Sequence, residues 1–220
     1  MARDPRSCRE VPCRPLRRGS GNRLLSNRKL TLDDIDDLRF YERRRAEAIA
    51  SIIALKKRRR AHVGPFVSLL FDNRETVLSQ IHEMARAERI LTDEGLQEQL
   101  DTYNPLIPDP GSLSATLMLE LTEDPQLREW LPKLVGIESH VVFRFAGEEV
   151  RSRVEQAHGE QLTREDVTAA VHFIEFGFTS HQVDSWGTGP VVLAVDHPEY
   201  SHESALSEEM AKELAKDLRG

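Results

Sequence analysis

Apolar residues recur at helical spacing along several segments of the chain, and the longest of these runs from residue 30 to residue 60. Its apolar stripe consists of Leu32, Ile35, Leu38, Ile49, Ile52 and Ile53. Thr31 is a suitable N-cap, and aspartates near the start and basic residues near the end complement the helix dipole. We predict one long helix of about 45 Å. Because this exceeds the width of a compact domain of this size, we expect part of it to pack on a second subunit.

Four further helices are predicted from the same periodicity and from their caps. These segments are residues 73–91, 93–103, 124–134 and 207–219. Asn73 and Ser207 are the expected N-caps of the first and the last of them, since both side chains accept hydrogen bonds from free amides of a first turn. One face of the last helix is made of Leu206, Met210, Leu214 and Leu218. That apolar face predicts that this helix packs on the core.

Strand patterns occupy residues 63–71, 112–121, 139–147, 168–178 and 189–197. The fourth segment is apolar on both faces except for His172 and Glu175, which is typical of a central strand. Several of the strands follow one another too closely for parallel crossovers, which need a dozen or more residues. We therefore predict an α+β fold: a mostly antiparallel sheet of about five strands with helices packed on one face, forming a single domain over residues 30–220.

Charge divides the chain into two unequal parts. Residues 1–30 contain nine Arg or Lys against Asp4 and Glu10, a net +7, while the other 190 residues carry a net −14. We predict a disordered basic Arg/Pro-rich tail over residues 1–29. The acidic remainder makes nucleic-acid binding an unfavoured function, because phosphate neutralisation needs clustered Lys and Arg. The two cysteines, Cys8 and Cys13, form at most half of a zinc site.

Hydropathy bears on localisation. No apolar run approaches the ~20 residues that span a bilayer, and the N-terminus lacks the apolar stretch of a secretory signal. We expect a soluble cytoplasmic protein without a membrane partner.

The stretch "HPEYSHES" is the first candidate site. Its four candidate residues are His197, Tyr200, His202 and Glu203. Pro198 ends strand pairing, so we predict an ordered connection of about nine residues before the last helix. Two interpretations stay open: a polar loop with Tyr200 packed on the sheet edge, or a catalytic or metal-ligating loop that binds zinc or iron.

Strand alternation suggests a second candidate. Glu120, His140 and His172 would line one concave surface if the polar faces of their strands align, and two histidines with a carboxylate suit zinc or iron. The alternative is that they are solvated face residues and a hydrogen-bonded core histidine. Glu88 lies on the apolar stripe of residues 73–91, so we predict a buried carboxylate, most simply one in an ion pair with an arginine. Phosphate-loop, dinucleotide, HExxH and GxSxG motifs are absent from the sequence, which still allows an enzyme.

Several segments together resemble an uncharacterised bacterial family, a domain of unknown function. They are "LTLDDIDDLRFYERRRAEAIASIIALKKRRR", "VGPFVSLLFDNRETVLSQIHEMARAERI", "YNPLIPDPGSLSATLMLEL", "LVGIESHV" and "VDHPEYSHESALSEE". The resemblance covers residues 29–219. Members of that family are often encoded near rubrerythrin and an iron–sulfur oxidoreductase, so the resemblance implies a role near peroxide or redox chemistry. It transfers no catalytic residues.

Two functions follow as hypotheses. The first is an accessory or interaction protein for a redox partner, dimeric through the long first helix. The second is a metal-dependent or small-molecule enzyme that uses the His197–His202 loop or the Glu120, His140 and His172 face.

Overall fold

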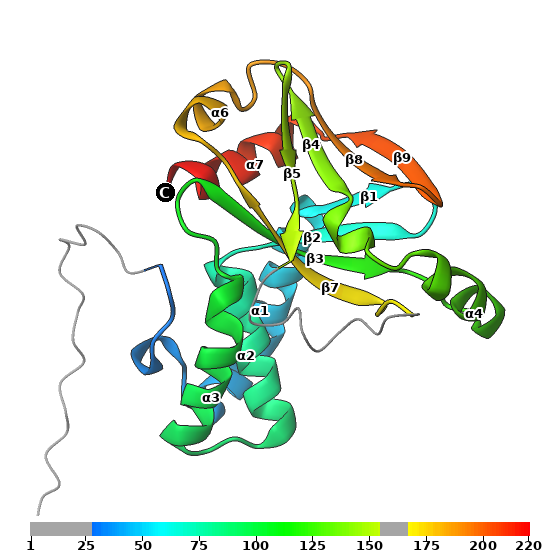
Figure 1. Ribbon diagram of the computed structural model, residues 1–220. Coiled ribbons are helices and arrows are strands. Elements are labelled where there is room, and N and C mark those ends of the chain that lie inside the picture. Colours follow the sequence, from blue (N-terminus) through cyan, green and yellow to red (C-terminus); the bar gives the residue numbers. More distant parts are fainter. Residues whose placement is uncertain (1–27, 155–166) are drawn as a thin grey trace, which may run out of the picture.

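The computed structural model describes residues 28–154 and 167–220. Figure 1 shows two sheets that face each other and a group of helices outside one of them. The predicted disordered tail lies outside the described residues apart from Arg28 and Lys29. Within the described parts of the chain, no helix is both long and apolar enough to cross a bilayer.

Helices and strands are interspersed along the chain. The helices are α1 Leu38–Arg58, α2 Arg74–Glu88, α3 Asp93–Tyr103, α4 Asp124–Lys133, α6 Ser180–Ser185 and α7 Glu208–Arg219, with 3₁₀ turns η1 Leu32–Asp34, η2 Asn104–Leu106 and η3 Ile137–Ser139. The strands are β1 Arg60–Val63, β2 Val67–Asp72, β3 Ser112–Leu119, β4 Val141–Phe145, β5 Glu148–Arg151, β6 Arg153–Val154, β7 Val171–Gly177, β8 Val191–His197 and β9 Tyr200–Ala205. The α+β class is confirmed.

The strands divide between two antiparallel sheets. One has the order β1-β2-β3-β7-β6 and the other the order β5-β4-β8-β9. Their inner faces share a core in which Phe143 of β4 lies 5.7 Å from Phe71 of β2 and 4.7 Å from Phe176 of β7, between ring centroids. Met210, Leu214 and Leu218 of α7 join this core, as the apolar face of the last helix predicted.

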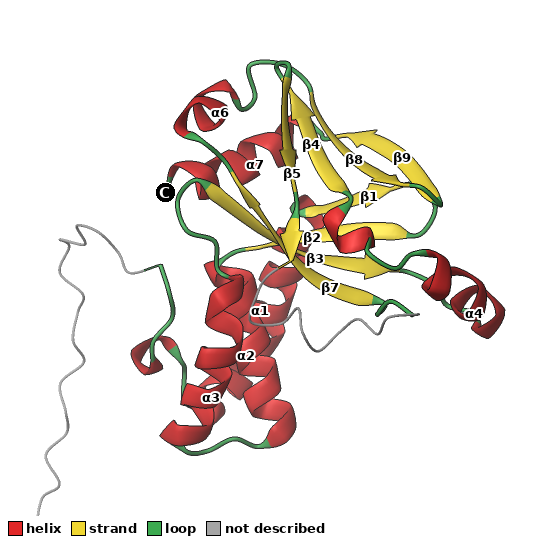
Figure 2. Cartoon of the chain, viewed as in Figure 1, coloured by secondary structure: helices red, strands yellow, loops and turns green. Residues whose placement is uncertain are grey.

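Helices α1, α2 and α3 lie together outside the five-stranded sheet (Figure 2). A second apolar cluster includes Val77 and Ile81 of α2 and Leu100 of α3, with Phe173 of β7 packed against it. The caps of α2 and α7 are those predicted: Asn73 accepts a hydrogen bond from the Thr76 amide, and Ser207 accepts one from Met210. Helices on one face of this sheet are therefore confirmed.

The long N-terminal helix is confirmed, with 21 residues in place of the 30 expected. Thr31 precedes the 3₁₀ turn η1, the backbone is extended at Ile35 (φ −88°, ψ 121°), and Asp37 caps α1 by accepting a hydrogen bond from the Arg39 amide. Asp36 lies outside any helix, and its amide donates a hydrogen bond to the ring of His82 in α2. This tertiary hydrogen bond keeps residues 35–37 out of the helix despite their spacing.

Arg59, just past the end of α1, is fully buried. Its Nε donates to the Phe71 carbonyl at 2.8 Å and its Nη2 donates to the Asp72 carbonyl at 3.2 Å. The guanidinium also pairs with Asp217, and Nη1 lies 3.6 Å from Glu213, both on α7. One cation thus joins α1, β2 and α7.

The stretch "HPEYSHES" is a tight hairpin, so the expected nine-residue connection was wrong. Strand β8 continues to His197, Pro198 and Glu199 make the turn, and β9 begins at Tyr200. Only Tyr200 of β9 is buried, and the other five residues are polar or partly exposed. Strand β9 therefore lacks the alternation that identifies a strand in a sequence.

Candidate functional site

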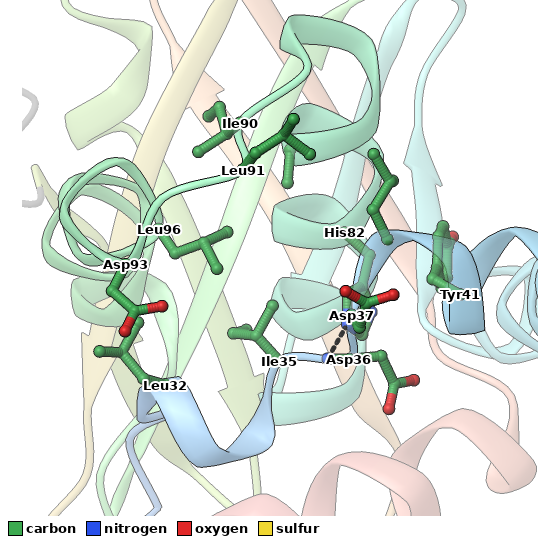
Figure 3. Close-up of a pocket in the computed structure, with 12 residues that line it drawn as sticks. Leu32, Ile35, Asp36, Asp37, Tyr41, His82, Ile90, Leu91, Asp93 and Leu96 are labelled. Carbon is green, nitrogen blue, oxygen red and sulfur yellow. Dashed lines mark hydrogen bonds between the residues drawn. The ribbon is translucent and has the colours of Figure 1, made fainter. Parts of the chain in front are cut away.

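A pocket of about 260 Å³ lies between the chain before α1, helix α2 and the start of α3. Its apolar lining includes Leu32, Ile35, Leu38, Ile90, Leu91 and Leu96. Figure 3 shows Ile35 and Leu96 pointing toward the same space from different segments. Leu91 is 75% exposed, the largest value among the exposed large hydrophobic residues of the described chain. The pocket therefore presents apolar surface to solvent where a binding partner can reach it.

His82 of α2 contributes an uncharged wall to the pocket. Its Nε2 accepts a hydrogen bond from the Asp36 amide at 3.0 Å, so the proton of the neutral ring is on Nδ1. Burial lowers the pKa of His82, which keeps the ring neutral at pH 7. The ring stacks on Tyr41 with centroids 4.6 Å apart and planes 21° from parallel. A second hollow of about 180 Å³ lies against the same two rings, so the Tyr41–His82 stack contributes wall to both.

Glu83 holds this wall in place. Its Oε1 accepts hydrogen bonds from the Tyr41 hydroxyl at 2.7 Å and from Arg45 Nε at 2.8 Å, and its Oε2 accepts one from Arg45 Nη2 at 2.7 Å. The bond with Arg45 is the main reason that the pKa of Glu83 is lowered to about 2. Burial, followed by the nearby Glu83, raises the pKa of Tyr41 to about 12. Neither group changes its protonation near neutral pH.

Carboxylates surround the apolar lining. Asp36, Asp37 and Asp93 all line the pocket. Asp37 is the N-cap of α1, Asp93 lies in the first turn of α3, and Asp36 is partly balanced by Arg44 at 3.6 Å. Both helix starts favour acidic residues because of the helix dipole, so local folding preferences place the negative charge here. The lining of the pocket therefore combines apolar side chains with three carboxylates.

Gly95 allows the close packing that forms the far wall. A Cβ added at this position would lie 2.7 Å from Ile90 Cγ2. Helix α2 ends at Arg89 in a left-handed conformation (φ 56°), and the Ile90 amide then donates to the Ala85 carbonyl. This turn brings Ile90 back against the start of α3, where only a glycine leaves room for it.

The arrangement favours binding over proton transfer. His82 uses its unprotonated nitrogen for a backbone amide, and Tyr41 and Glu83 are fixed in one protonation state each. His82 and Tyr41 are therefore not poised for proton transfer, while the apolar surface and carboxylates of the lining suit an apolar group that carries positive charge.

Of the hairpin residues predicted as a site, Tyr200 and His202 contact each other, whereas Glu203 pairs elsewhere. Tyr200 is 3% exposed, and its hydroxyl donates to the Val63 carbonyl at 2.6 Å. The ring of His202 lies 4.5 Å from that of Tyr200, and Gly64, at φ 72°, approaches both side chains so closely that a Cβ would clash with them. Glu203 lies 3.6 Å from Arg144 in an exposed ion pair. The packing of Tyr200 matches the loop interpretation of its role.

The structure brings together two histidines from different candidate sites. The rings of His140 and His197 are 5.0 Å apart between centroids. His197 Nδ1 accepts from the Glu199 amide at 3.3 Å, so its Nε2 carries the proton and donates to the Val135 carbonyl at 3.1 Å. Both nitrogens of His197 therefore have backbone partners.

Glu120, His140 and His172 do not converge. Glu120 accepts hydrogen bonds from Arg60 and from Ser68, whereas His172 is buried beside Thr168 and the Ala169 carbonyl. His140 directly precedes a strand of the other sheet, so the expected alignment of polar faces fails. Among the residues of the two described ranges, no group of three or more His, Cys, Asp or Glu is placed to hold a metal.

His172 is buried and Glu175 is exposed on β7, so their side chains point to opposite faces of the sheet. Glu88 is exposed, and the prediction of a buried carboxylate was wrong, because α2 ends at this residue beyond its last packed turn. Glu138 was missed: its Oε2 is buried without a hydrogen-bond partner in the described structure and lies 3.8 Å from His172 Nδ1.

The pocket itself was also missed from the sequence. The one available signal was His82, a polar residue directly after the core residue Ile81 in a strongly periodic helix. Its partners, Asp36 and Tyr41, are more than 40 residues away in the chain. Only the tertiary structure brings the three together.

Comparison with other proteins places the chain in a family. The family model described as "Protein of unknown function (DUF3501)" matches residues 29–218. A crystal structure at 1.90 Å of a novel protein of unknown function from Burkholderia pseudomallei K96243 is 36% identical, covers 86% of this chain and 99% of that one, and gives a TM-score of 0.79. No curated protein matches the chain. The fold and the sequence agree, and this chain belongs to the DUF3501 family of proteins of unknown function.

Proposed function

We propose that this chain is an interaction protein that receives a basic, apolar segment of a partner protein in the pocket between η1, α2 and α3. The observation that carries the proposal is Leu91, 75% exposed beside an apolar hollow with three carboxylates in its lining. An apolar anchor that enters a pocket is the usual centre of an interface, and opposite charges around it select the partner and speed association.

The partner segment has a definite chemistry under this proposal. Its apolar side chain enters between Ile35 and Leu96, and its Lys or Arg residues face Asp37 and Asp93. We further propose that the partner belongs to a peroxide or iron–sulfur redox system. The support for this second part is the resemblance alone, because the pocket indicates the chemistry of the segment and not the activity of the protein that carries it.

A second contact is proposed for α1. Phe40 and Ile53 are 51% and 61% exposed on this helix, and because they are 13 residues apart they lie on different sides of it. We propose that a second copy of the chain covers the side of α1 that carries Ile53 in a homodimer, so this contact and the pocket serve different partners.

One pair of variants tests both contacts, because each serves as the control for the other. Leu91→Asp should abolish capture of the partner from lysate of the source cells and leave the dimer mass in light scattering unchanged. Ile53→Asp should give a monomer and leave the capture intact. Mass spectrometry should identify an iron–sulfur or peroxide-reducing protein that the wild type retains at low salt and releases at high salt. Equal capture by wild type and Leu91→Asp would exclude the pocket, and a monomeric wild type would exclude the dimer.

The enzyme hypothesis takes second place. Its support is the contact between His140 and His197, which joins the two candidate sites. Elemental analysis of the wild type beside a His140→Ala/His197→Ala variant tests it. Zinc or iron near one equivalent, lost in the variant, would favour the enzyme over the interaction protein.

A further inference from the structure

A larger hollow of about 640 Å³ lies between the chain that follows α6 and one face of α7. Its size is within the range of about 300–1,000 Å³ in which proteins bind small molecules. The hollow is distinct from the pocket between η1, α2 and α3, because the two share no lining residue. The partner proposed for that pocket therefore does not account for this hollow.

Small residues create this hollow. Ala211 and Ala215, one turn apart on α7, face it, and Gly187 and Gly189 line the opposite side. A Cβ added at either glycine would have no atom within 4 Å, so open space lies beside both. Met210, Leu214 and Leu218 of α7 lie in the core, and Ala215 belongs to the same core cluster while it also borders the hollow.

The floor of the hollow is rigid. Trp186 is 3% exposed, and its indole N–H donates to the Ala211 carbonyl at 2.9 Å. The same ring contacts Phe143 and Phe145, with centroids 5.2 Å away in each case. Because these contacts fix the indole, a ligand would meet a preformed surface and would lose little binding energy to ordering the protein.

The charged groups determine the class of ligand. Lys212 and Arg219 line the hollow against one carboxylate, Glu208, so the lining carries a net +1 in a strongly acidic chain. Glu208 is already paired with Lys212 at 3.2 Å. In the described residues no carboxylate pairs with Arg219, so its guanidinium is available to an anion.

We propose that this hollow binds a small molecule with an apolar body and one anionic group. The apolar body lies on Val191, Leu206 and Ala215, and the carboxylate, sulfonate or phosphate pairs with Arg219. This site is independent of the proposed interaction pocket, so either proposal can fail without the other.

The dye 8-anilinonaphthalene-1-sulfonate combines these features and serves as the probe. Titration of the wild type with the dye should give one saturable site and energy transfer from Trp186 to the bound dye. The transfer should persist in Trp130→Phe, which removes the only other tryptophan in the sequence. Gly189→Leu should fill the hollow and weaken binding at least tenfold, while Gly177→Leu, at another glycine with open space beside it, should not.

The anionic group is tested separately. Arg219→Gln should weaken binding of the sulfonate dye several-fold and leave binding of its uncharged analogue, N-phenyl-1-naphthylamine, unchanged; Lys57→Gln is the charge-matched control on α1. Unchanged dye affinity in both Gly189→Leu and Arg219→Gln would overturn the proposal. Arg219 is exposed at the end of α7, so Arg219→Gln should fold. The proposal can therefore still be tested if Gly189→Leu does not fold.

Discussion

The guanidinium of Arg59 is paired with the carboxylate of Asp217, 158 residues further along the chain. Arg59 is fully buried, and the pair links the end of α1 to α7. Burial raises the pKa of Asp217 more than the nearby Arg59 lowers it. A buried cation of this kind depends on its partner, since an unpaired charge in the interior is very costly.

Asp217→Ala should therefore lower the free energy of unfolding by about 3–5 kcal/mol, the usual effect of leaving a buried charge without its partner. Urea denaturation at pH 7 measures it. Lys212→Ala, on the exposed side of the same helix, should change stability by less than about 0.5 kcal/mol. Similar small effects of both variants would mean that Glu213 alone, 3.6 Å from Arg59, compensates the charge.

Asp72 should make stability depend on pH in the opposite direction to most carboxylates. Burial raises its pKa from 3.8 to about 6, although the Thr116 and Thr76 hydroxyls donate to it and Lys56 and Arg59 lie nearby. Between pH 4 and 6 the folded protein keeps a proton that the unfolded chain has lost, so the contribution of Asp72 to stability falls as the pH rises.

The rise in the pKa of Asp72 from 3.8 to about 6 lowers the free energy of unfolding by about 3 kcal/mol in total, at about 1.4 kcal/mol per pH unit. An asparagine at this position cannot titrate. The free energy of unfolding of Asp72→Asn should therefore rise by about that amount relative to wild type from pH 4 to pH 7. Chemical denaturation at both pH values measures it. Asp196→Asn should show no such gain, because the hydrogen bond with Arg151 lowers the pKa of Asp196 and its contribution to stability is lost only as the pH falls below the unfolded value of 3.8. A constant difference for Asp72→Asn would show that Asp72 is ionised at little cost.

Tyr41→Phe should destabilise the wall of the pocket. The variant loses the 2.7 Å hydrogen bond to Glu83 and keeps the ring that stacks on His82. Hydrogen bonds to charged groups contribute about 1.5–3 kcal/mol, and a loss of that order is expected in chemical denaturation. If Arg45 alone fixes Glu83, stability will stay within experimental error of wild type.

Gly95→Ala should distort the pocket without unfolding the protein. The new methyl group would meet Ile90 at 2.7 Å, so Ile90 must shift. Alanine also has a higher helix propensity than glycine, by about 1 kcal/mol in a helix interior, so the melting temperature should change little. Methyl NMR shifts at Ile90, Leu91 and Leu96 are expected to move, whereas those of Val191 and Leu206 at the other hollow should not.

Sequence periodicity predicted the helices well because a helix is a local structure. The caps Asn73 and Ser207 and the apolar faces of α2 and α7 all depend on residues a few positions apart. Strand patterns also located β3 and β7 correctly along the chain. They could not show that the strands form two sheets, because the pairing of a strand depends on partners far away in the chain.

The candidate sites were harder to predict for the same reason. Glu120 and His172 have the residue types of a metal site, but their surroundings are Arg60, Ser68 and Thr168 rather than each other. Conversely, the pocket beside His82 is made of common residue types without a motif. Its properties come from which segments pack together, and a single sequence does not record that.

The hydrogen bond from Tyr200 to Val63 has a consequence for folding kinetics. It joins β9 to β1 across 137 residues. Closing such a loop costs conformational entropy, and this cost arises before the contact can stabilise the folded state. Topologies rich in distant contacts fold slowly. The hairpins β1–β2 and β8–β9 can each form early, whereas their junction at Tyr200 forms late. Loss of the hydroxyl in Tyr200→Phe should therefore speed unfolding and leave the folding rate nearly unchanged.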